Sequence, residues 1–128
     1  MKNKIWLVLV FMLAGILSLQ AQQQGFQKRT IEERVTSTMD KISDSLQLST
    51  PQKTDAANTF SDYYKAMDKM REGMAPGTRP ERSDFEKMIT ERDAKLKIIF
   101  TEAQYKKYKE QLEPAMRHSR GDRPQGNN

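Results

Sequence analysis

Apolar residues recur at helical spacing in four separate stretches of this chain. Between residues 31 and 46 they follow one another at intervals of four, four, three and four residues, at Ile31, Val35, Met39, Ile42 and Leu46. Such intervals place side chains on one face of an α-helix. Similar patterns predict further helices over 50–72, 84–99 and 102–113, with Pro114 ending or kinking the last. The sequence therefore indicates an all-α fold of four amphipathic helices.

Each predicted helix start carries a pair of residues suited to capping it. A Ser or Thr stands three residues ahead of a Glu or Gln in the pairs Thr30/Glu33, Ser49/Gln52, Ser83/Glu86 and Thr101/Gln104. In a capping box the hydroxyl accepts a hydrogen bond from the third helical N–H, and the Glu or Gln accepts one from the N–H of the cap. Two donors that the helix leaves unpaired are thereby satisfied.

The connections between the predicted helices are of two kinds. Residues 73–82 contain two Gly and two Pro, and such a segment cannot continue a helix. The other two connections, before Ser49 and before Thr101, are only a few residues long. Because short connections join antiparallel neighbours, we expect two helical hairpins joined by a flexible loop.

The first 21 residues have the features of a secretory signal peptide. Lys2 and Lys4 form a basic start, and Ala21 closes a small-residue exit after an apolar run. That run is shorter than the ~20 residues of a transmembrane helix, and an uncleaved membrane anchor is the alternative. The expected organisation is a signal peptide at 1–21, a disordered leader at 22–29, a helical domain at 30–116 and a disordered polar tail at 117–128.

Charge and composition argue against nucleic-acid binding and catalysis. Removal of Lys2 and Lys4 lowers the net charge from +5 to +3, which indicates a mixed surface without a concentrated basic patch. The chain has no Cys, so it offers no disulfide. His118 is the only histidine, whereas zinc sites use three or four such ligands. We therefore expect no enzyme activity, no metal and no cofactor.

The acidic residues are spread along the predicted helices beside basic ones. The run Glu91-Arg92-Asp93 is an example. Alternating signs of this kind are typical of a solvated helix face, and they do not form a general acid–base pair. Large apolar residues are sparse in the part after the signal peptide, and a thin core on long helices favours self-association. We therefore expect a homodimer.

Two of the capped helix starts share a longer motif. Leu48-Ser49-Thr50-Pro51-Gln52 and Phe100-Thr101-Glu102-Ala103-Gln104 both match Leu-Thr-x-x-Gln with one conservative change each. Such a pair behind a secretory signal resembles the Spy/CpxP family of bacterial periplasmic stress proteins. The resemblance covers about residues 30–116. We interpret the residues that match the family motif as helix-capping positions. They are Leu48, Ser49, Gln52, Phe100, Thr101 and Gln104.

The resemblance implies a small helical protein that dimerises antiparallel into a cradle. It also implies a periplasmic location and an ATP-independent chaperone that holds unfolded or misfolded envelope proteins. The first alternative is a regulatory partner that restrains an envelope-stress sensor kinase, and the second is a purely structural envelope protein. A chaperone should protect several unrelated clients, whereas a regulator should bind one partner tightly.

A stripe of Met and aromatic residues on the second predicted helix is the candidate client-binding surface. Periodic apolar residues of this kind usually form core. The alternative is that part of the stripe is exposed, because flexible Met side chains can repack against different partners, and flanking cations would steer the encounter. The candidate residues are Tyr64, Lys65, Met67, Lys69, Met70, Arg71 and Met74.

Overall fold

The computed structural model describes residues 28–121, which are helical apart from their connections. The predicted all-α fold is confirmed for this part of the chain. Its helices are α2 (Ile31–Leu46), α3 (Thr50–Glu72), α4 (Arg82–Ile99) and a last helix made of α5 (Glu102–Lys107), the π-helical turn η1 (Tyr108–Leu112) and α6 (Glu113–Gly121).

Two of the expected segments lie mostly or wholly outside the described residues. They are the signal peptide at 1–21 and the leader at 22–29, and the end of the expected tail, 122–128, lies outside as well. Between residues 28 and 121, none of the helices combines the length and the apolar character that crossing a membrane requires.

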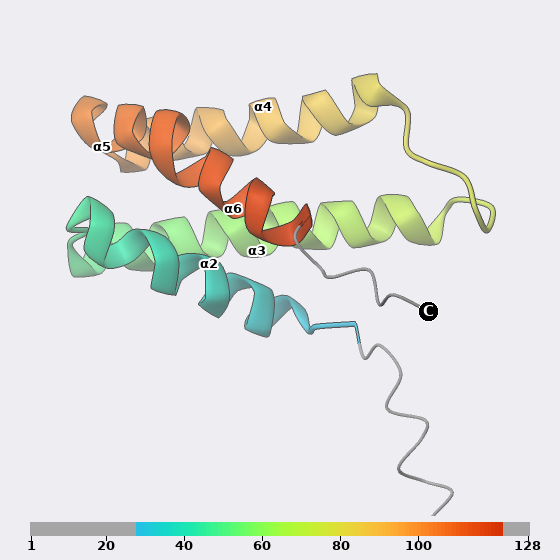
Figure 1. Cartoon of the computed structure of the whole chain (residues 1–128), viewed down its shortest axis with the longest axis horizontal. Helices are drawn as coiled ribbons and strands as arrows, with labels where there is room; N and C mark the ends of the chain where they lie inside the picture. Colours follow the sequence, from blue (N-terminus) through green and yellow to red (C-terminus); the bar gives the residue numbers. More distant parts are fainter. Residues whose placement is uncertain (1–27, 122–128) are drawn as a thin grey trace, which may run out of the picture.

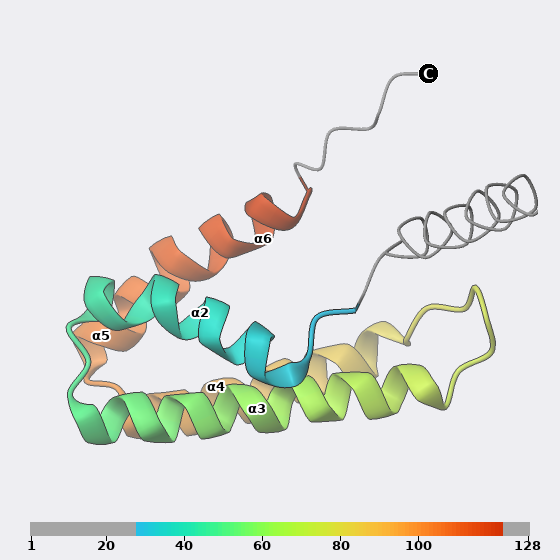
Figure 2. The same ribbon diagram turned by 90° about the horizontal axis from the view of Figure 1, so that it is seen from below.

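Helix α3 forms the middle of the molecule. Helix α4 runs back along one side of α3, and α2 packs along another (Figure 1). The two short connections, at 47–49 and at Phe100–Thr101, lie at the same end, and the loop of residues 73–81 lies at the opposite end (Figures 1 and 2). Figure 2 shows that α6 diverges from α3. We call the first end the corner end and the second the loop end.

The core lies between α3 and its neighbours. Phe60 is 2 % exposed and Tyr108 1 %, and their ring centroids are 6.2 Å apart in an edge-on contact. Phe100 makes a similar contact with Tyr108, with centroids 6.0 Å apart. Such aromatic pairs add to the stability gained from the buried area itself. The other buried apolar residues are Ile42, Leu46, Leu48, Ala56, Tyr64, Met67 and Leu96.

Polar contacts tie α2 to α3 beside this core. The hydroxyls of Thr38 and Tyr64 are hydrogen-bonded at 2.7 Å, and both residues are buried. The Arg34 guanidinium donates to Asp68 at 2.9 Å and stacks 4.2 Å from the centre of the Tyr64 ring. These contacts supply partners for polar groups that burial would otherwise leave unpaired.

Helix α4 begins earlier than the sequence predicts. It starts at Arg82, and the carbonyl of Glu81 accepts the N–H of Phe85 at 3.2 Å. The predicted capping box between Ser83 and Glu86 does not form. Arg82 binds the Glu86 carboxylate instead, with Nε 2.6 Å from Oε1. The prediction was wrong because Ser83 lies inside the first turn, after the position that a cap must occupy.

The last helix continues past Pro114 to Gly121, so the predicted end of the helical domain at 116 is too early. A proline ring clashes with the carbonyl four residues before it, here that of Glu110. The π-helical turn just before Pro114 widens the backbone, and Glu113 donates its N–H to the Tyr108 carbonyl, five residues back. Residues 117–121, expected in a disordered tail, are helical.

Candidate functional site

The two copies of the Leu-Thr-x-x-Gln-like motif cap the helices that follow them. At the start of α3, Gln52 donates its backbone N–H to the Ser49 hydroxyl at 3.3 Å, and Ser49 donates its N–H to Gln52 Oε1 at 2.9 Å. At the start of α5, Thr101 and Gln104 make the same exchange, at 3.2 and 2.9 Å. Both are complete capping boxes.

The two motif glutamines also bind each other across the corner end. Gln52 Nε2 donates to Gln104 Oε1 at 2.8 Å and to the carbonyl of Ile99 at 3.0 Å. Gln104 Nε2 donates to the carbonyl of Leu46 at 3.0 Å, and lies 3.4 Å from Gln52 Oε1. We call these two side chains with the two carbonyls the glutamine clasp. Gln52 thereby caps α3 and also binds the C-terminal end of α4, whereas Gln104 caps α5 and also binds the C-terminal end of α2.

The apolar residue before each cap anchors the corner end in the core. Leu48 and Phe100 are 6 % and 5 % exposed and belong to the core. Each helix start is therefore fixed by a buried side chain before the cap and by the clasp after it. Taken together, these contacts give the motif residues an architectural role: they cap and position the helices that meet at the corner end.

The first corner contains one residue more than the second. Gln47 has φ 52° and ψ 51°, in the left-handed region, and Leu48 donates its N–H to the Ser43 carbonyl at 3.0 Å. Gln47 also donates its backbone N–H to the Asp44 carbonyl, and the two bonds together form a hydrogen-bond pattern that often ends a helix. In the second corner Phe100 alone separates Ile99 from the cap Thr101.

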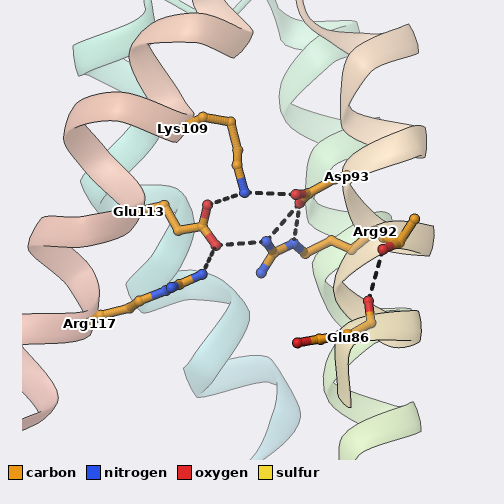
Figure 3. Close-up of polar contacts among 7 residues, drawn as sticks. Glu86, Arg92, Asp93, Lys109, Glu113 and Arg117 are labelled. Atoms are coloured by element: carbon orange, nitrogen blue, oxygen red, sulfur yellow. Dashed lines mark hydrogen bonds and ion pairs between the residues drawn. The ribbon is translucent and has the colours of Figure 1, made fainter. Parts of the chain in front are cut away.

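A second polar cluster joins α4 to the last helix (Figure 3). Arg92 donates to Glu113 at 2.9 Å and to Asp93 through both Nη2 and Nε, at 2.7 and 2.9 Å. Lys109 binds Asp93 at 2.7 Å and also pairs with Glu113. Arg117 binds Glu113 at 2.6 Å. We call these five residues the ion latch.

The centre of the ion latch is shielded from solvent, whereas Arg117 at its edge is exposed. The side chains of Arg92 and Glu113 are each 7 % exposed. Burial acts to raise the pKa of Glu113, but hydrogen bonds from its three cationic neighbours outweigh burial and lower the pKa to about 2. Burial acts to lower the pKa of Lys109, and its hydrogen bonds to Asp93 and Glu113 raise it instead. Glu113 is therefore a carboxylate at neutral pH.

The interpretation of Glu91-Arg92-Asp93 as a solvated helix face is wrong for Arg92, the only buried residue of the three. Its guanidinium lies 4.8 Å from the centre of the Tyr63 ring, and the aromatic face and the two carboxylates replace the water that a charge loses on burial. The sequence signal that could have revealed it is the interruption of the α4 apolar face by a single cation, at a position where the spacing predicts core.

The candidate client-binding residues fall into two groups. Tyr64 and Met67 are buried in the core, so the core interpretation of the stripe is confirmed for them. Met70 and Met74 are half-buried toward the loop end, while the cationic side chains beside them are exposed: Lys65, Lys69 and Arg71. Among the Met and aromatic candidates, Met70 and Met74 are therefore the partly accessible ones.

Helix α4 contributes apolar residues close to this accessible part. Lys95 lies 3.5 Å from Asp62, and the Arg92–Tyr63 contact sets the same antiparallel register. Extending that register toward the loop places Met70 level with residues 85–87 of α4. Phe85 is 36 % exposed, and Ile89, one turn further along α4, is half-buried. We call Met70, Met74, Phe85 and Ile89 the loop-end patch.

Within 28–121 there is no group of three or more His, Cys, Asp or Glu side chains that could hold a metal ion. His118 lies exposed on α6. The carboxylates that gather in the structure, Asp93 and Glu113, are each neutralised by cations in the ion latch.

No protein-family model matches this chain, and searches of curated proteins and of solved structures give no significant match. The resemblance to the Spy/CpxP family therefore stays a hypothesis based on two five-residue motifs.

Proposed function

We propose that this protein is an ATP-independent periplasmic chaperone that holds unfolded or misfolded envelope proteins. The observation that supports this proposal most directly is the loop-end patch. It consists of two flexible Met side chains, one Phe and one Ile that the core leaves partly exposed, with exposed cations nearby. A surface of this kind can repack against many partner sequences, and its charges would speed the first encounter with an acidic segment.

The proposal includes the quaternary structure. Two helical hairpins, α2 with α3 and α4 with the last helix, would form each protomer, and two protomers would pair antiparallel into a cradle. The apolar side chains that each protomer leaves half-exposed support self-association. Sedimentation of the purified protein at micromolar concentration tests this part, with twice the protomer mass as the expected result.

An aggregation-suppression assay tests the activity. The purified protein, without nucleotide, is added to two unrelated chemically unfolded clients at up to equimolar ratio. We expect the light scattering of both clients to fall. A folded protein that protects neither client contradicts the proposal, and tight binding to a single sensor domain without protection would favour the regulatory alternative.

The double variant Met70→Ser/Met74→Ser locates the surface. We expect weaker client holding with a change in stability of about 0.5 kcal/mol, because partly exposed positions tolerate substitution. Ile98→Ser is the matched control, since Ile98 is an apolar residue of α4 that is 87 % exposed and lies near the corner end. Equal holding by the double variant and wild type would place the client surface elsewhere.

A further inference from the structure

The joint between η1 and α6 differs from the rest of the last helix. In an α-helix, residues three or four apart share a face, whereas the π-helical turn pairs Tyr108 with Glu113, five residues on. The wider turn allows Tyr108 to lie in the core while Glu113 meets Arg92 on α4. Pro114 follows at once and has no N–H to donate back to Glu110.

Helix α6 is short and contributes little to the buried apolar core. It is the last nine residues of the continuous helix that begins at Glu102, and nine residues on their own fall below the ~12–15 at which an isolated helix becomes even marginally stable in water. Among the described elements, η1 is the one with which it makes extensive contact, and η1 directly precedes it in the chain. Met116 is half-buried against the core. Figure 2 shows α6 extending away from α3.

Two ion pairs of the latch cross from α4 to the last helix. They join Arg92 to Glu113 and Asp93 to Lys109. The other contacts of Glu113, with Lys109 and Arg117, lie within the last helix at a spacing of four residues and stabilise its helical form. Glu113 therefore takes part both in holding α6 to α4 and in keeping α6 helical.

We propose that α6 is a separately ordered arm, and that the ion latch around Glu113 controls its order. When the latch is intact, residues 113–121 are helical and held against α4. When Glu113 loses its charge, Arg92 keeps Asp93 as partner, and α6 loses its attachment to α4. The arm then opens while α2, α3 and α4 stay folded, because none of the buried apolar core residues lies in α6, which adds only the half-buried Met116. This inference is independent of the proposed function.

Amide hydrogen exchange on the purified protein tests the proposal by comparing wild type with Glu113→Gln, which removes the charge and keeps the shape. We expect the amides of residues 115–121 to exchange about tenfold faster or more in the variant, with the amides of α3 unchanged. Glu110→Gln is the matched control, because Glu110 is an exposed carboxylate of the same turn, and it should leave exchange in α6 as in wild type.

Two results would overturn the proposal: unchanged exchange at 115–121 in Glu113→Gln, or equal acceleration in all helices. A measurement on wild type alone covers the case in which the variant fails to fold. In low concentrations of urea, the amides of α6 should exchange through a local opening that depends little on denaturant, unlike those around Phe60. The same denaturant dependence in both segments would show that α6 is no separate unit.

Discussion

Gln52 and Gln104 stand 52 residues apart in the chain, and their side-chain amides are hydrogen-bonded to each other at 2.8 Å. This contact explains why both motif copies end in Gln. A capping box needs only a side-chain oxygen at this position, and Glu supplies one as well. Binding to the carbonyls of Ile99 and Leu46 needs an N–H donor, which a carboxylate lacks. The clasp therefore requires the amide, whereas the cap does not.

Replacing either clasp glutamine by glutamate should lower the free energy of unfolding. In Gln52→Glu the capping box can still form, but the carbonyl of Ile99 loses its partner and two acceptors face each other. We expect a loss of about 1 kcal/mol, the lower end of the cost of leaving a buried polar group unpaired, because these contacts are only partly buried; urea denaturation measures it. Glu33→Gln in the capping box of α2 is the control, and should change stability by about 0.5 kcal/mol or less. Equal changes in stability at positions 33 and 52 would contradict a stabilising role of the clasp beyond capping.

The cap hydroxyls should contribute to stability and not to client binding. Ser49→Ala and Thr101→Ala each remove one cap acceptor, so we expect each to lower the free energy of unfolding by about 0.5–2 kcal/mol. Thermal denaturation measures the loss. If Thr101→Ala melted like wild type and yet abolished client holding, Thr101 would be a contact residue.

Gln47→Gly should make the protein more stable. Gln47 adopts the left-handed backbone conformation with φ 52°, which costs a residue with a side chain about 1–2 kcal/mol. Glycine avoids most of that cost but loses more conformational freedom on folding, so we expect a net gain of about 0.5–1 kcal/mol. The midpoint of urea denaturation reports it. A lower midpoint would mean that the Gln47 side chain makes a favourable contact that outweighs its backbone conformation.

Stability should fall in acid because of Glu113. Its pKa is about 2 in the folded protein, against an ordinary value of 4.5. The folded state therefore favours the carboxylate, and this contribution is present above pH 4.5 and is lost as the pH falls toward 2. We expect the loss to be on the order of 2 kcal/mol. Glu113→Gln should show a shallower dependence over this range, and parallel curves for the two proteins would exclude Glu113 as the cause.

The first two helices could be predicted to the residue because their signals are local. Thr30 and Ser49 stand directly before apolar patterns, and α2 and α3 begin and end as expected. The extent of the last helix beyond Pro114 could not be predicted, because proline either ends or kinks a helix and no residue pattern before it indicates a π-helical turn.

The clasp and the latch could not be read from the chain for a different reason. Both depend on residues that are far apart in sequence: the two glutamines are separated by 52 positions, and Arg92 and Glu113 by 21. The capping motif predicts the bond of each glutamine to its own cap residue, but not its bonds to the other glutamine and to a distant carbonyl. A charge pattern such as that around Arg92 is typical of a solvent-exposed helix face. Only the structure shows that Glu113 lies close enough to Arg92 to replace the water that the guanidinium loses on burial.

The glutamine clasp has a consequence for how such a chain could have arisen. Its two sides are nearly equivalent, since each side chain reaches a carbonyl just ahead of the other motif, at Leu46 or Ile99. The extra residue Gln47 accounts for the difference of one position between them. In a half-length ancestor with one motif, the glutamine side-chain amide would lack part of its hydrogen-bond partners. Pairing with an identical copy about a twofold axis would supply them. Fusion of two such copies would turn an intermolecular contact into the internal one seen here.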